Sequence, residues 1–206
     1  MRLLVSLFTV VVLLSSSVTA QEDVVAELFG QPVTLADLSP DAKTLSQFAR
    51  MNAASKDMAL AQYQHAMLSD KILKAVLDDY QQQKQITVDD ALVEKFKARF
   101  AASLNSPSMT SDERKSADEI AKKQVLRWQI DKALYEQYGG TVIFQQSNPL
   151  MPAGAYDMLL KAYRDNGAFA ITDDRFRAVF WEAIEPPYPF VIDAAQVDFS
   201  QPWWLN

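Results

Sequence analysis

The sequence predicts a mainly α fold, an orthogonal bundle of about five to six helices with a small β element. Apolar residues recur at the spacing of a helix face through most of the chain. Ser, Thr and Asp precede these runs and glycines follow several of them, as at helix starts and ends. β-Branched and aromatic residues dominate the short segments 24–34 and 141–144, which are the predicted strands.

The first 20 residues have the composition of a secretory signal peptide. Arg2 supplies a positive charge, residues 3–14 are apolar, and residues 15–20 are small and end at Ala20. A membrane anchor is the alternative, but a spanning helix needs about 20 apolar residues and this run is shorter. We expect cleavage after Ala20, no integral membrane segment thereafter, and a periplasmic address, or secretion from a cell with a single membrane.

Charge and cysteine content narrow the classes of partner and site. The formal charge is −6, and it becomes −7 when Arg2 leaves with the signal peptide. An acidic surface disfavours nucleic acid and anionic lipid headgroups as partners. The chain contains no cysteine, which excludes thiol nucleophiles, thiolate metal sites and disulfides. An apolar core must therefore supply its stability.

The β element begins shortly after the predicted cleavage site. Residues 24–29 favour a strand, Gly30-Gln31 can form a turn, and residues 32–34 form a second extended piece. Residues 141–144 (TVIF) are the other convincing strand. We expect 24–29 to pair with 141–144, which would bring the two ends of the helical region together.

Two helical runs follow the predicted hairpin. Ser39 is the expected N-cap of a helix that ends near residue 53, and Ser55 can cap a run that ends near residue 83. The apolar stripe of the second run comprises Leu60, Tyr63, Met67, Ile72, Val76 and Tyr80. One long helix and two helices joined near Ala54 both fit this pattern.

The next two helices are predicted from their starts and ends. The segment from Thr87 to Asp90 resembles a capping box and opens a helix. The apolar residues of that helix recur every four positions, at Leu92, Phe96 and Phe100. After a loop at 105–110, a long helix is expected over 111–137, because Gly139-Gly140 ends it.

The remaining chain is mixed and rich in proline and aromatic residues. We expect a loop at 145–152, a helix at 153–166 that Gly167 stops, and a helix at 172–184. Residues 186–189 (PPYP) cannot be helical and are expected to run as polyproline.

The first part of the chain resembles SurA-type periplasmic chaperones. Residues 24–38 (VVAELFGQPVTLADL) are similar to the family's opening of hydrophobic strand, Gly-containing turn, short strand and helix entry. Residues 70–80 (DKILKAVLDDY) resemble its helix before a polar turn, and 86–90 (ITVDD) resemble the turn before the next helix. The long helix at 111–137 fits its closing helix, so the resemblance covers residues 24–138.

The resemblance implies a helical chaperone domain at 21–138 that holds apolar segments of other envelope proteins. The family usually adds a parvulin-type prolyl isomerase domain, which needs more residues and more histidines than follow Gly140. Isomerase activity is therefore not expected. Residues 139–206 match nothing in the chaperone, and with their run YGGTVIFQQ they resemble a bacterial family of unassigned function. They are expected to form an α-rich extension packed on the first domain.

Residues that could carry catalysis are few. His65 is the single histidine and a candidate base, but the sequence places no nucleophile or orienting group beside it. The adjacent pairs Asp78-Asp79, Asp89-Asp90 and Asp173-Asp174 lack the separation that acid–base chemistry across a substrate needs. Two of these pairs stand where helix starts favour negative charge, so capping is the favoured interpretation. No catalytic residue, metal site or cofactor is assigned.

Five residues are candidate binding residues. Met51, Met58 and Met67 lie along the early helices, and flexible methionines suit a surface that grips varied apolar sequences, although core filling is the commoner role. Trp203 and Trp204 can dock back on the domain or wait for a partner. Docking back is favoured, because exposed tryptophan pairs promote aggregation.

Three functions remain open from the sequence, and each predicts a different feature. A chaperone-like binding protein for unfolded or partly folded envelope proteins should expose a contiguous apolar groove. An accessory subunit with a dedicated protein partner should leave residues 186–206 exposed or disordered when alone. A hydrolase should place His65 in a concave pocket beside an oriented carboxylate.

Overall fold

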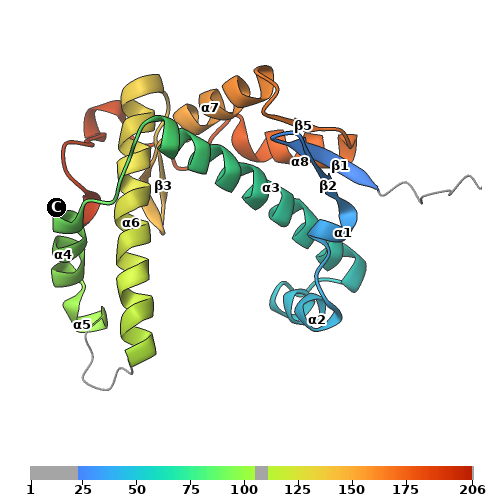
Figure 1. Ribbon diagram of the computed structural model, residues 1–206, viewed down its shortest axis with the longest axis horizontal. Coiled ribbons are helices and arrows are strands. Elements are labelled where there is room, and N and C mark those ends of the chain that lie inside the picture. Colours follow the sequence, from blue (N-terminus) through green and yellow to red (C-terminus); the bar gives the residue numbers. More distant parts are fainter. Residues whose placement is uncertain (1–22, 105–110, 206) are drawn as a thin grey trace, which may run out of the picture.

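Helix dominates the part of the chain that the computed structural model describes, residues 23–104 and 111–205 (Figure 1). The mainly α fold class with a small β element is confirmed. The predicted signal peptide at 1–20 and the loop expected at 105–110 lie outside the described residues.

The helices and strands are bounded as follows. The longer helices are α2 (Ala42–Met51), α3 (Lys56–Gln83), α4 (Asp90–Arg99), α6 (Ser111–Tyr138), α7 (Ala153–Asp165) and α8 (Asp174–Ile184). The short helical elements are α1 (Leu35–Leu38), α5 (Ala101–Leu104), η1 (Ala194–Gln196) and η2 (Trp203–Leu205). The strands are β1 (Val24–Leu28), β2 (Gln31–Thr34), β3 (Ile143–Gln145), β4 (Asn148–Met151) and β5 (Phe169–Ile171).

Residues 41–83 form two helices, because helical structure is interrupted between Met51 and Lys56. Ser55 is the N-cap of α3, as predicted, and its hydroxyl accepts a hydrogen bond from the backbone N–H of Met58 at 3.3 Å. Two other predicted starts were wrong by two residues. Asp41 rather than Ser39 caps α2, and Asp89 rather than Thr87 caps α4. A carboxylate is as good an acceptor as a hydroxyl and adds favourable charge at the helix start.

A three-stranded antiparallel sheet joins the start of the chain to its last third. β1 is the central strand, with β2 on one side and β5 on the other. The backbone N–H groups of Thr172 and Asp173 both donate to the Val25 carbonyl, at 2.9 and 3.2 Å. These contacts fix the entrance of α8 against β1.

The predicted pairing of 24–29 with 141–144 is wrong. β3 pairs with β4 in a separate hairpin, and Ile143 also forms a bridge with Val191. The segment that reaches β1 is β5, which was expected to be a connection between helices. β5 has three residues, which is too short for a sequence pattern to separate from a loop.

The larger hydrophobic core lies between the sheet, α3, the C-terminal half of α6, α7 and α8. Its buried members come from both sides of the predicted boundary after residue 138, and they include Val25, Leu38, Ile72, Val76, Leu134, Leu159, Leu160 and Phe169. Residues 139–184 therefore share one core with the N-terminal segment.

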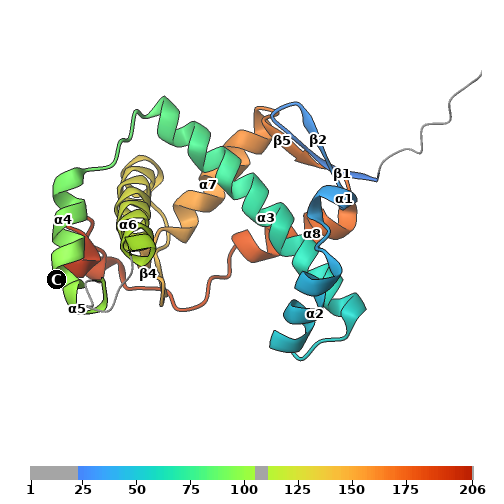
Figure 2. The same cartoon turned by 60° about the horizontal axis from the view of Figure 1, so that its bottom comes forward.

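A second, smaller hydrophobic cluster packs α4 against α6 and is closed by the C-terminal residues. Val93, Phe96, Val125, Trp128 and Trp204 are buried in it. Helices α3 and α6 approach each other near their C-terminal ends and diverge away from them, so the molecule has the outline of an arch (Figure 1). In the second view α7 crosses behind α3, one arm of the arch, and its N-terminal end lies toward α6, the other arm (Figure 2).

Candidate functional site

A groove of about 760 Å³ runs between the two arms of the arch. One wall is the C-terminal half of α3, from Asp70 to Gln81, and the other is the stretch of α6 from Lys123 to Ile130. Met151 of β4, Tyr156 of α7 and Ile184 of α8 complete the lining. Its volume lies in the range of about 300–1,000 Å³ that is usual for ligand sites.

The walls of the groove are helix faces with regular spacing. On α6 the lining residues 123, 126, 127 and 130 follow the three- and four-residue steps of one face, and on α3 the lining residues follow the same steps. The apolar lining consists of Leu73, Leu77, Leu126, Ile130, Met151 and Ile184. All except the buried Ile130 are partly buried side chains that pack against the larger core. One side of each rests on the core while the other side stays open, so the apolar surface is preformed.

The two walls carry different charges. The α6 wall presents Lys123 and Arg127. The α3 wall presents Asp70, Lys74 and Asp78, of which Lys74 and Asp78 form an ion pair with each other. The groove therefore combines an apolar base with a cationic wall on one side and a mixed wall on the other.

A buried polar network lies behind the α6 wall. Asp131 is 1 % exposed, and its two carboxylate oxygens accept hydrogen bonds from the Tyr156 hydroxyl at 2.6 Å and the Asn148 side-chain amide at 2.8 Å. Arg127 Nε lies 3.8 Å from the same carboxylate. Burial raises the pKa of Asp131 to about 6, against the lowering effect of the Tyr156 hydrogen bond and of Arg127. Burial and the nearby Asp131 also raise the pKa of Tyr156.

The three methionines do not line the groove. Met51 and Met58 lie at the tip of the α2–α3 hairpin, 84 % and 56 % exposed, and Met67 is half-buried against the larger core. Met58 precedes Asp70, the first residue of the groove, by about 18 Å along the α3 axis. The structure therefore does not bring the methionines together with the groove.

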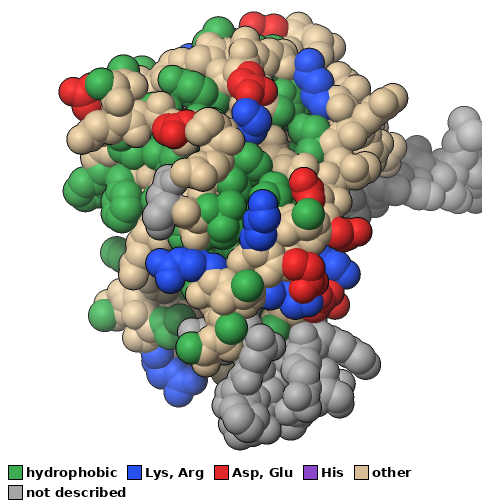
Figure 3. Space-filling model, turned by 90° about the vertical axis from the view of Figure 1, so that its left-hand side faces the viewer, with side chains coloured by type: hydrophobic (Ala, Val, Ile, Leu, Met, Phe, Trp, Pro, Cys, Tyr) green, Lys and Arg blue, Asp and Glu red, His purple; other side chains and the backbone are tan. Residues whose placement is uncertain are grey.

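The two tryptophans have different environments. Trp204 is 2 % exposed and packs edge-on against Phe96 and Trp128, with ring centroids 5.2 and 6.1 Å away. Trp203 is half-buried, 6.3 Å from the Phe100 ring. Other hydrophobic side chains are concentrated in the upper part of the face on which α4 lies (Figure 3). Trp204 is a core residue in this structure and is not open to a partner.

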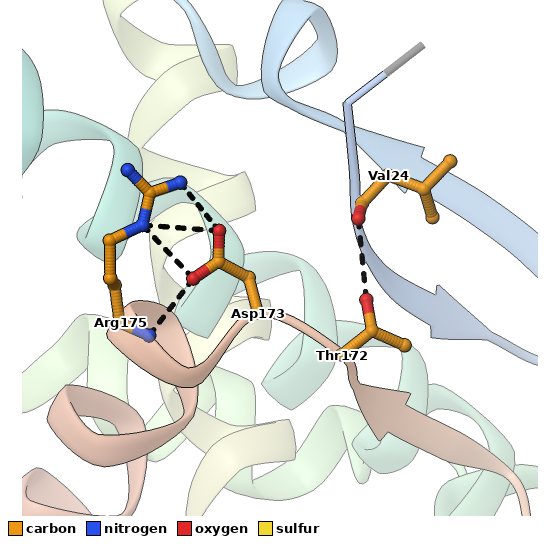
Figure 4. Close-up of polar contacts among 4 residues, drawn as sticks. All are labelled: Val24, Thr172, Asp173 and Arg175. Carbon is orange, nitrogen blue, oxygen red and sulfur yellow. Dashed lines mark hydrogen bonds and ion pairs between the residues drawn. The ribbon is translucent and has the colours of Figure 1, made fainter. Parts of the chain in front are cut away.

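His65 does not line the groove. Its ring lies 4.5 Å from the ring of Phe176, and burial lowers its pKa. The charged groups that act on it are Asp173 and Arg175. Asp173 is already engaged, because its carboxylate caps α8 and accepts hydrogen bonds from the Arg175 side chain, while Thr172 beside it donates to the Val24 carbonyl (Figure 4). An orienting carboxylate for His65 is therefore not assembled at this position.

The adjacent carboxylate pairs have structural roles. Asp89 and Asp173 are the N-caps of α4 and α8, as predicted for two of the pairs. Asp79 accepts a hydrogen bond from the Tyr163 hydroxyl at 2.6 Å, which ties α3 to α7. Within the described ranges, no cluster of three or more His, Cys, Asp and Glu side chains could hold a metal ion. In the same ranges, no helix combines the length and apolarity that crossing a membrane requires.

Sequence reasoning did not identify the groove. The predicted stripe of α3 ran through Ile72, Val76 and Tyr80, which face the core, whereas Leu73 and Leu77 lie one position further round the helix. A leucine beside a buried stripe is as common at the edge of a core as in a binding site. Asp131, however, follows Trp128 by three positions and precedes Leu134 by three, so it lies on an apolar face of α6, and an acidic residue in that position is a signal for a buried polar site.

Comparison of the chain with protein-family models, with characterised proteins and with solved structures found no match.

Proposed function

We propose that this chain is a periplasmic, chaperone-like binding protein that holds apolar segments of unfolded or partly folded envelope proteins, without prolyl isomerase activity. The groove between α3 and α6 is the proposed binding site. The signal peptide expected at residues 1–20 supports the location, and the resemblance of residues 24–138 to SurA-type chaperones supports the class of function.

One observation carries this proposal: the groove exposes leucine and isoleucine side chains that are already packed against the core. A segment of another chain that covers them gains about 25 cal/mol for each Å² of apolar surface removed from water. Because the walls are long helices, the site loses little conformational freedom when it is occupied. The lining of the groove on α3 runs from Asp70 to Gln81, about 17 Å along the helix axis, which matches about five residues of an extended segment.

The first expected result concerns the groove leucines. Purified residues 21–206 should suppress the aggregation of a denatured outer-membrane β-barrel protein on dilution from urea, followed by light scattering. We expect Leu73→Gln with Leu126→Gln to weaken suppression about tenfold, because the two changes together remove roughly 1.4 kcal/mol of apolar contact. Urea unfolding of the variant checks that the fold persists.

A matched control changes exposed apolar residues outside the groove. Met58→Gln with Val179→Gln replaces side chains that are 56 % and 42 % exposed, and suppression should stay at the level of the unchanged protein. Equal suppression by both double variants would reject the groove as the binding site. No suppression by the unchanged protein over a wide range of ratios would reject a general holding function.

A second candidate is an accessory subunit with a dedicated partner, and one surface favours it. Phe144, Phe190 and Val191 are 52 %, 77 % and 57 % exposed. They lie together, because the backbone N–H of Phe144 donates to the Phe190 carbonyl at 2.9 Å and Ile143 bridges to Val191. A dedicated partner would bind this C-terminal apolar patch (Phe144, Phe190 and Val191). Phe190→Ser should then release a partner that the unchanged protein retains in a pull-down, whereas the groove double variant should still retain it.

A further inference from the structure

The cations on the α6 wall of the groove stand out against the acid-rich composition of the chain. Lys123 and Arg127 are one helical turn apart and both line the groove beside Leu126 and Ile130. The described residues include no ion pair of Lys123 with an acidic side chain. A positive charge beside an apolar surface, on a chain of net charge −6, points to a ligand with a negative charge.

Arg127 lies beside the buried network. Its Nε lies 3.8 Å from the Asp131 carboxylate, which is itself fixed by Tyr156 and Asn148. The Arg127 side chain is still 46 % exposed, so the rest of its guanidinium group remains open to a ligand. A guanidinium can pair with a carboxylate through two parallel N–H donors, and the exposed part of the Arg127 group has such donors to offer.

The opposite wall does not offer an equivalent site for a cation. Asp78 is paired with Lys74 of the same wall, which leaves Asp70 as its unpaired charge among the lining residues. A ligand carboxylate near α6 meets Lys123 and the exposed side of Arg127, whose charge is shared with the buried Asp131, whereas a ligand cation near α3 meets Asp70.

We infer that the groove selects apolar segments that carry a carboxylate beside their apolar residues, with Arg127 as the anchoring cation and Lys123 as its support. This inference rests on the proposed function, and it adds the chemical class of the segment that is bound.

Three labelled peptides with one apolar sequence test the inference. Each has a central Leu-Phe-Leu-Phe-Leu run, blocked termini and two flanking residues on either side, which are Asp, Gln or Lys. Binding is measured by fluorescence anisotropy at pH 7.5 in low salt. We expect the Asp peptide to bind about tenfold more tightly than the Lys peptide, with the Gln peptide between them, and we expect added salt to reduce this difference.

The variants assign the preference to the named residues. Arg127→Gln should abolish most of the preference and leave the affinity for the Gln peptide within about twofold, whereas Arg127→Lys should retain part of it. Lys123→Gln should give a smaller loss, and Lys95→Gln on α4, outside the groove, should give none.

Each outcome has a separate meaning. Equal binding of the three peptides, or tighter binding of the Lys peptide, would overturn the inference and leave the proposed function standing. A preference for the Asp peptide that survives Arg127→Gln and Lys123→Gln together would also overturn it, since other cations would be responsible. Binding of none of the peptides at millimolar concentration would overturn both the inference and the proposed function.

Discussion

Replacing Trp204 with alanine should lower the free energy of unfolding by about 3–5 kcal/mol, the range for truncation of a large buried aromatic residue. Trp204 is 2 % exposed and contacts Phe96 and Trp128, so its removal leaves a cavity at the centre of the smaller cluster. That cluster has few members, and it joins the C-terminal end of the chain to α4 and α6. Urea unfolding followed by far-UV circular dichroism measures the change.

Two controls separate packing from other effects. Among the described residues, the Trp204 indole N–H has no hydrogen-bond partner, so Trp204→Phe loses volume without losing a hydrogen bond and should cost less than half as much. Trp203→Ala changes a half-buried neighbour and should cost about 1–2 kcal/mol. Hydrogen exchange should accelerate in α4 more than in α7 in the Trp204→Ala variant. A change below about 1 kcal/mol would show that Trp204 is not part of the stable core.

Acidification from pH 7.5 to pH 5 should stabilise the protein through Asp131. The pKa of this buried carboxyl is raised from the ordinary 3.8 to about 6, so the folded state binds its proton more tightly than the unfolded state does. Stability from this group is therefore complete below about pH 4 and is lost as the pH rises to about 6. Between pH 7.5 and pH 5 the expected gain is about 1 kcal/mol, because the free energy changes by up to roughly 1.36 kcal/mol per pH unit below the raised pKa.

Asp131→Asn should remove this pH dependence, because asparagine keeps the shape of the side chain and has no proton to bind. Tyr156 can still donate to the amide oxygen, and Asn148 can turn its amide to present an acceptor. At pH 7.5 the variant should equal or exceed the stability of the unchanged protein, since the cost of burying a charge is gone. Urea midpoints at pH 5, 6 and 7.5 for both proteins measure the effect.

The pH window separates Asp131 from the carboxylates whose pKa values are lowered. Five carboxylates have lowered pKa values: Asp37, Asp41, Asp118, Asp173 and Asp198. Their contribution to the stability of the protein is therefore lost only when the pH falls below about 4. Burial also lowers the pKa of His65, which makes its contribution fall on acidification and oppose that of Asp131. His65→Gln should therefore steepen the gain at pH 5. An unchanged pH profile in Asp131→Asn would show that Asp131 titrates in its ordinary range.

The sequence by itself determined the local structure. Hydrophobic spacing and capping residues predicted the mainly α class, the start of α3 at Ser55 and the hairpin of β1 and β2. Such features depend on interactions between residues that are three or four positions apart, so a local pattern is enough to reveal them. The carboxylates at the starts of α4 and α8 were assigned to capping for the same reason.

Only the tertiary structure decided which distant segments meet. β5 pairs with β1 across more than a hundred residues of chain, and its three residues carry no pattern that selects this partner over β3. The groove depends on the angle between α3 and α6, which leaves Leu73 and Leu126 open while Ile72 and Val125 are buried. Leucine, isoleucine and valine look alike in a sequence, because burial is a property of the packed arrangement rather than of the residue. The same packing turns Asp131 from one of many acidic residues into a buried carboxyl with a raised pKa, 3.8 Å from Arg127 at the groove.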